Sequence, residues 1–149
     1  SEDFAAEMRK LCEMADIITP NRTEARLLLG DAPDDEAVSN EALLAGLHNK
    51  NVIITSVRRG DKIGYLARLG TEIVRIEKPM VHRQLHGTGD VFTSALCGEV
   101  LSGGNIKNAL LAAADFCDRS IQDTAKYQPA HWYGLCFEEE LSKRRCSLK

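Results

Sequence analysis

The most restrictive feature of the sequence is an unbroken apolar run, NVIIT, at residues 51–55. A run of this kind, without alternation, is typical of a strand that is covered on both faces by helices. A second short run at residues 16–19, DIIT, stops at Pro20 and predicts another buried strand. Two such strands, separated by helical patterns, favour an α/β fold.

Helical patterns surround these two strands. Apolar residues at helical spacing predict an amphipathic helix over residues 4–14, and NRTEARLLLG predicts a second helix that ends at Gly30. The other expected elements are a helix over 36–50, a hairpin of strands 62–69 and 71–78 that turns at Gly70, a helix within 86–101, a long helix from about Asn105, and a short C-terminal helix. The expected sheet has fewer strands than the usual number of about five or six.

The composition is that of an ordinary globular protein. The chain has 149 residues, 44% hydrophobic and 28% charged, with a formal net charge of −3. Its length predicts a single domain over residues 1–149. Slight acidity argues against a nucleic-acid partner, and the apolar runs are too short to cross a membrane. The N-terminus does not resemble a signal peptide, and five scattered cysteines favour a reduced compartment, so we expect a cytoplasmic protein.

The segment HGTGD at residues 86–90 admits two explanations. Gly87, Thr88 and Gly89 could point successive N–H groups at one spot in front of the following helix, which would form an anion hole for a phosphoryl group. Asp90 could then accept the proton of an attacking hydroxyl group. The alternative is ordinary helix capping, with Thr88 as the N-cap and Asp90 matching the helix dipole. The segment alone does not decide between them.

Two further segments carry the same ambiguity. Asn21 and Glu24 have the spacing of a capping box, but they also follow a predicted strand, where Glu24 could hold Mg²⁺ through water. Thr55 and Ser56 offer hydroxyl groups where a buried strand stops. Ligands of open α/β sheets bind at such carboxyl ends, although a polar residue there needs no special explanation.

Taken together, these segments resemble the pyridoxal kinases of the ribokinase-like superfamily. The matching segments are ADIITPNRTEARLLLG, VIITS, HGTGDVFTSAL, DFCDRSI and YGLCFEEEL, in the family order. The resemblance implies a ribokinase-like, layered α/β/α fold with a mostly parallel sheet, of which this chain holds the C-terminal, ATP-binding half. It further implies phosphoryl transfer from ATP to the hydroxymethyl group of pyridoxal, pyridoxine or pyridoxamine, with Mg²⁺ as a cofactor and a monovalent cation left open.

The resemblance also implies a role for each candidate residue. Asp90 would be the catalytic base, with Gly87, Thr88 and Gly89 as the anion hole and Glu24 at the metal. The residues implied to contact ATP are Asn21, Thr55, Ser56, and Val81 and Leu85 at the ends of a loop beside the nucleotide.

Alternatives remain within this resemblance. Hydroxymethylpyrimidine kinases commonly carry Cys at the position of Asp90, and sugar kinases tend to read Gly-Ala-Gly-Asp, so GTGD favours pyridoxal. A non-catalytic, nucleotide-binding half-domain is a third possibility, because the N-terminal half of the family pattern is not in the sequence. We therefore expect low turnover of pyridoxal. We also expect a long apolar sheet edge and an uncovered helix-packing face, buried by homodimer formation or other self-association.

Overall fold

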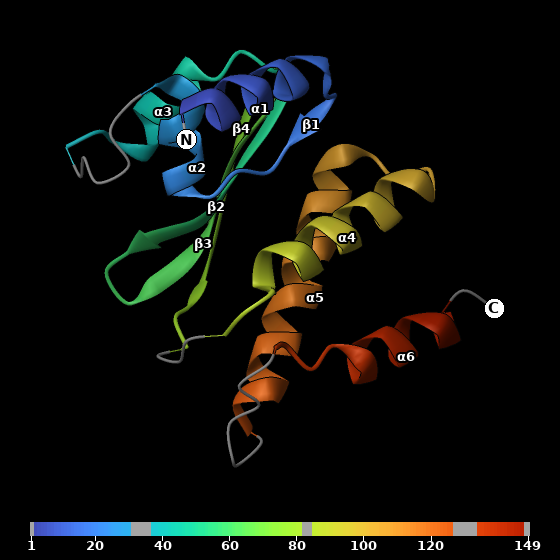
Figure 1. The fold of residues 1–149 in the computed structure, drawn as a ribbon. Coiled ribbons are helices and arrows are strands. Elements are labelled where there is room, and N and C mark those ends of the chain that lie inside the picture. The colour runs from blue at the N-terminus through green and yellow to red at the C-terminus, as the bar shows by residue number, and fades with distance from the viewer. Residues whose placement is uncertain (1, 31–36, 82–84, 127–133, 148–149) are drawn as a thin grey trace. The chain divides into compact units, whose positions relative to one another are not determined.

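The computed structural model describes residues 2–30, 37–81, 85–126 and 134–147 (Figure 1). The chain forms two compact units, Ser1–Glu77 and Lys78–Lys149. Each unit has its own packing and is described by itself. The expectation that residues 1–149 form a single domain stays a prediction.

The sheet of the first unit is mixed. Its four strands lie in the order β1 (Ile17–Ile18), β2 (Asn51–Arg59), β3 (Lys62–Leu69) and β4 (Glu72–Pro79). The pair β1–β2 is parallel, whereas β2–β3 is antiparallel. The predicted α/β class is thus confirmed, and the described strands include one parallel and one antiparallel pair. The reason is that β2 continues past Thr55, and turns at Gly60 and Gly70 lead into neighbouring strands.

The helices of the first unit are α1 (Glu2–Met14), α2 (Arg22–Leu29) and α3 (Asn40–Gly46). As predicted, α2 ends at Gly30, which has a left-handed φ of 84°. The helix α3 is shorter than the predicted span of 36–50. It starts late because the Ser39 side chain accepts a hydrogen bond from Ala42 N, and it ends where Leu47 turns extended and enters the core.

The core of the first unit lies where α2 and α3 pack against the sheet. Its buried members are Ile18, Ala25, Leu43, Leu44, Leu47, Val52, Ile54, Val57 and Leu66. From α1, Cys12 packs against this cluster, and burial raises the pKa of its thiol. Other apolar residues of α1 are exposed. Most of the exposed large apolar side chains of this unit lie on α1, and Leu27 and Ile73 are exposed on α2 and on the edge strand β4. The edge strand β1 has only two residues, and the expected long apolar edge stays a prediction.

The second unit contains the helices α4 (Thr88–Leu101), α5 (Ile106–Lys126) and α6 (Glu138–Ser147). Small residues let α5 approach α4, with Ala113 and Phe92 both buried. The Glu140 carboxylate joins α6 to α5 through Arg119 Nε, at 2.7 Å. Hydrogen bonds from Lys143 and Arg119 hold the pKa of Glu140 below its usual value. No helix among the described residues is both long and apolar enough to span a membrane.

We predict that Gly64→Ala destabilises the first unit. Gly64 is buried in β3, and a Cβ atom there would lie 1.9 Å from the carbonyl oxygen of Ile76. Because that neighbour is backbone, the strands β3 and β4 would have to separate, at a cost of about 2 kcal/mol or more. Urea unfolding measures the change. Gly98→Ala in α4 is the control, since nothing lies within 4 Å of its added methyl group. An unchanged unfolding midpoint for Gly64→Ala would contradict the prediction.

Candidate functional site

An open cleft of about 620 Å³ lies in the first unit, where the chain leaves β1 and passes β2. The residues that line it all carry polar or charged side chains, namely Asn21, Arg22, Thr23, Asn40, Ser56 and Arg58. Two predicted nucleotide-binding residues, Asn21 and Ser56, therefore line the same cleft. Thr55, another of the five residues predicted to contact ATP, is buried and is not one of the lining residues.

The parallel pairing of β1 and β2 positions the cleft. Thr55 N donates a hydrogen bond of 2.9 Å to Pro20 O, and Asn21 bridges Thr55 in the parallel sense. Beyond this point the two segments diverge, because α2 begins at Arg22 while β2 continues. The cleft lies at this divergence, which is the usual ligand position in open α/β sheets.

Ser56 has an unusual backbone conformation. Its φ of 58° makes it the one residue other than glycine with a positive φ in the described part of the chain. The pairing of β2 with β3 also shifts register between Ile54 and Val57, which marks a β-bulge. A left-handed conformation costs a non-glycine residue about 1–3 kcal/mol, and such strain is concentrated at functional sites. The exposed Ser56 side chain, between buried neighbours, lines the cleft.

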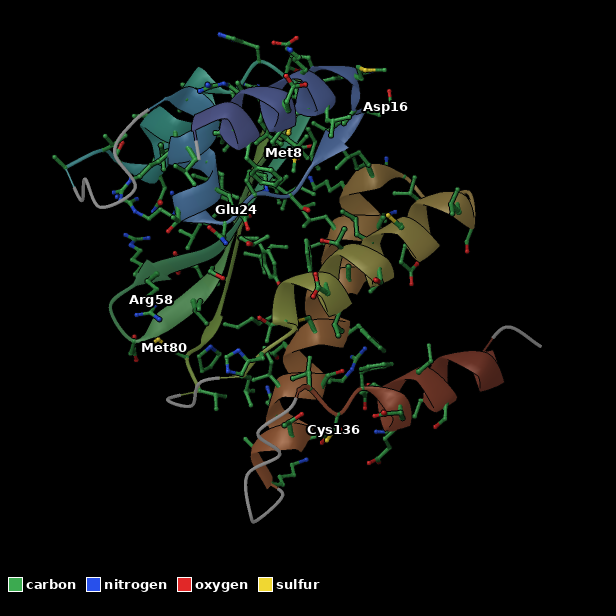
Figure 2. The ribbon with its side chains drawn as sticks, viewed as in Figure 1. Met8, Asp16, Glu24, Arg58, Met80 and Cys136 are labelled. Atoms are coloured by element: carbon green, nitrogen blue, oxygen red, sulfur yellow. The ribbon has the colours of Figure 1, made fainter. Side chains whose placement is uncertain are left out.

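Asn21 and Glu24 form the capping box that their spacing predicts. Asn21 Oδ1 accepts from Glu24 N at 2.9 Å, and Glu24 Oε2 accepts from Asn21 N at 2.8 Å. The ordinary structural explanation is therefore satisfied at the start of α2, where Figure 2 labels Glu24. Glu24 stays exposed, and its Oε1 has no hydrogen-bond partner within the described ranges. A carboxylate with one available oxygen fits a Mg²⁺ ion that keeps most of its water ligands. No group of three or more acidic, His or Cys side chains suited to a metal occurs in the described residues.

Sequence reasoning missed two arginines of the cleft. Arg22 is held by α3, since its Nη1 donates to Asn40 Oδ1 at 2.6 Å and its Nη2 donates to Val38 O. Arg58 is exposed on β2, as labelled in Figure 2. The available signal was its spacing, because residues two apart on a strand point to the same face and Ser56 was already a candidate.

The start of α4, in the second unit, contradicts one part of the capping explanation for HGTGD. The N-cap is Gly87, with a φ of 80° and no side-chain cap, and Thr88 is the first helical residue. The capping role considered for Thr88 is therefore wrong. Gly89 has open space around the position of a Cβ atom, so packing does not require glycine there. The exposed Asp90 follows in the first turn.

The first amide groups of α4 thus face no side-chain cap and have a carboxylate close by in sequence. A helix start of this kind can bind an anion through its N–H groups and dipole. Val81 and Leu85, both half-buried, end the predicted nucleotide loop, whose middle residues 82–84 lie outside the described residues. The roles of all these residues stay predictions.

Comparison with known proteins identifies the family. The sequence profile of the phosphomethylpyrimidine kinase family matches residues 1–135, so the chain belongs to that family. It is 29% identical over 138 residues to the hydroxymethylpyrimidine/phosphomethylpyrimidine kinase of Haemophilus influenzae, covering 85% of this chain and 50% of that one. It is 30% identical to the pyridoxal kinase PdxY of Corynebacterium diphtheriae, over 77% and 43% of the two chains.

A solved structure gives the fold. The crystal structure of pyridoxal kinase from Lactobacillus plantarum superposes with a TM-score of 0.87 and 25% identity, covering 99% of this chain and 55% of that chain. The predicted similarity to pyridoxal kinases is therefore confirmed. The chain spans about half the length of the curated relatives it matches.

Proposed function

We propose that this chain provides the ATP-binding part of a kinase that phosphorylates the hydroxymethyl group of pyridoxal, pyridoxine or pyridoxamine. The observation that carries the proposal is the uncapped start of α4 at Gly87, followed by the exposed Asp90. The use of ATP is supported by two relatives, a pyridoxal kinase of Bacillus subtilis solved as an ADP complex and one of Plasmodium falciparum solved with AMP-PNP and PL. They are 25% and 27% identical to this chain.

In this proposal the residues of α4 perform the transfer. Asp90 accepts the proton of the acceptor hydroxyl as its oxygen bonds to the γ-phosphorus, while the bond from that phosphorus to ADP breaks. The N–H groups of Thr88 and Gly89 stabilise the charge on the transferred phosphoryl oxygens. A bound Mg²⁺ ion would supply positive charge to the phosphates, and Glu24 would hold it through water.

A second candidate differs only in the acceptor. Hydroxymethylpyrimidine carries the same reactive group, and both the family profile and the Haemophilus influenzae relative name a pyrimidine kinase. Asp90 favours the pyridoxal group, because the pyrimidine kinases commonly have Cys at this position. A third candidate is a nucleotide-binding half-domain without catalysis. An acceptor panel of pyridoxal, hydroxymethylpyrimidine and ribose separates these candidates.

We predict that Asp90→Asn lowers kcat for the preferred acceptor by about 100-fold or more, because a positioned general base contributes about 10² to 10⁴. Its affinity for ATP should stay within about twofold, since the amide keeps the shape of the side chain. Coupled detection of ADP release measures transfer. Asp61→Asn, an exposed change in the turn between β2 and β3, is the control. Undiminished transfer by Asp90→Asn would exclude Asp90 as the base. ATP binding without transfer to any acceptor would favour the half-domain.

We predict that Glu24→Gln separates the metal role from the capping role. A Gln side chain can still accept the hydrogen bond from Asn21 N, so the unfolding free energy should change by less than about 0.5 kcal/mol. Without the carboxylate charge, the Mg²⁺ concentration needed for half-maximal ATP binding should rise about tenfold. Titrations of Mg²⁺ at fixed ATP measure this. Asn21→Ala is the comparison, because loss of the cap should destabilise by about 1 kcal/mol. If Glu24→Gln leaves the Mg²⁺ requirement unchanged, Glu24 is a capping residue only.

We further propose that the chain self-associates as a homodimer through α1. Four exposed apolar side chains recur at helical spacing along one side of this helix, namely Phe4, Met8, Leu11 and Met14. Phe4, Leu11 and Met14 are 66%, 62% and 84% exposed. A stripe of four side chains covers less area than a standard interface, and an exposed apolar stripe can mark an interaction site. A standard interface buries about 800 Å² per partner, so we expect a weak, concentration-dependent dimer.

We predict that Leu11→Glu abolishes this self-association, because the dimer would bury an unpaired charge. Sedimentation velocity over about a hundredfold range of protein concentration measures the effect. Glu13→Gln, an exposed change on the same helix outside the stripe, should leave the dimer unchanged. A wild-type chain that stays monomeric over the whole range would contradict the proposal.

A further inference from the structure

We infer that Arg58 provides the principal charged contact to the phosphate chain of the nucleotide in the cleft of the first unit. This inference rests on the proposed ATP-dependent function. It goes beyond the contacts expected at Asn21 and Ser56, because the charge comes from a residue that the motifs do not include. The ligand class is a chain of phosphates, as in a nucleoside triphosphate.

The charge of the cleft lining favours an anion. Two guanidinium groups, two amides and two hydroxyl groups line the cleft, and no carboxylate is among the lining residues. The Glu24 carboxylate is next in sequence to the lining, but its Oε2 is engaged in the capping box. Glu41, which follows the lining residue Asn40, is paired with Arg75. Positive side chains in a recess whose lining has no carboxylate concentrate anions from solution.

The two cleft arginines differ in what already holds them. Arg22 donates to Asn40 Oδ1 and to Val38 O, so its guanidinium is committed to fixing the start of α3. The guanidinium of Arg58 has no hydrogen bond or ion pair to any other described residue. Its neighbour Arg59 instead pairs with Glu77 Oε1 at 3.3 Å. Adjacent strand residues point to opposite faces of a sheet. Arg59 therefore pairs with a residue of β4, whereas Arg58 lines the cleft.

The bulge in β2 is the reason that Arg58 and Ser56 act together. The register shift between Ile54 and Val57 and the left-handed Ser56 change the direction of the strand beside the cleft. Bulges of this kind re-aim side chains and are common next to active sites. After the bulge, Ser56 and Arg58 both line the cleft. A hydroxyl donor and a planar guanidinium are a suitable pair for phosphate oxygens, which arginine can bind through two parallel hydrogen bonds.

The test compares Arg58→Gln with Arg59→Gln in the 149-residue chain, by calorimetric titration with ATP, inorganic triphosphate and AMP, in EDTA at low salt. Both variants remove one positive charge from neighbouring positions, so they match in net charge. Arg58→Gln should weaken ATP and triphosphate about tenfold and AMP by less than about threefold, as expected for a partly exposed, charge-assisted contact. Arg59→Gln should stay within about twofold for all three ligands. Loss for triphosphate as well as ATP would show that the phosphate chain, rather than the nucleoside, is recognised.

The outcomes separate this inference from the proposed function. If Arg58→Gln binds ATP as the wild type does, or if both variants lose affinity equally, the inference is wrong while ATP binding stands. If the wild-type chain binds no ATP at millimolar concentration either in EDTA or with excess Mg²⁺, the proposed function itself is overturned. Arg58→Lys controls for a loss of ATP affinity that is caused by misfolding of the Arg58→Gln variant. It should keep the charge and recover part of the affinity, and full loss with an unchanged thermal midpoint would mean that the bidentate geometry is required.

Discussion

The first unit depends on one short stretch of parallel backbone pairing. Ile17 and Ile18 pair with β2, and the hydrogen bond from Thr55 N to Pro20 O carries the pairing one step further. This contact joins two segments that are more than thirty residues apart in sequence. It fixes the point where α2 begins and where β2 becomes free to bulge. The capping box, the cleft and the strained Ser56 all lie at or just after this point.

At two places a structural role and a functional role coexist in the same residues. The Asn21–Glu24 capping box is complete, yet one Glu24 oxygen remains available to a ligand. At Gly87 the reverse holds, because the helix starts without the side-chain cap that Thr88 would have supplied. A capping box whose hydrogen bonds are complete can still offer a carboxylate oxygen to a ligand. A helix start without a side-chain cap leaves backbone N–H groups available to an anion.

The sequence predicted the elements whose signals are local. Gly30 predicted the end of α2, the alternation of residues 62–69 predicted β3, and the Ala-rich segment predicted α5. The errors came from contacts between distant residues. The extension of β2 to Arg59 depends on pairing with β3, and the end of α3 depends on burial of Leu47. For the site, Asn21 and Ser56 follow from motif spacing. Arg58 does not, because its spacing from Ser56 becomes a signal only when β2 is known to continue past Thr55, and that extension depends on pairing with β3.

The left-handed backbone at Ser56 has a consequence for the thermodynamics of ligand association. Ser56 lies between residues of β2 that pair with β3, so the energetic cost of its conformation is met by the strand pairing that forms on folding. A recess shaped in advance in this way avoids the entropy loss of ordering a loop around the incoming molecule. Complex formation at this cleft should therefore be governed by the exchange of hydrating water for phosphate oxygens, with little rearrangement of the main chain.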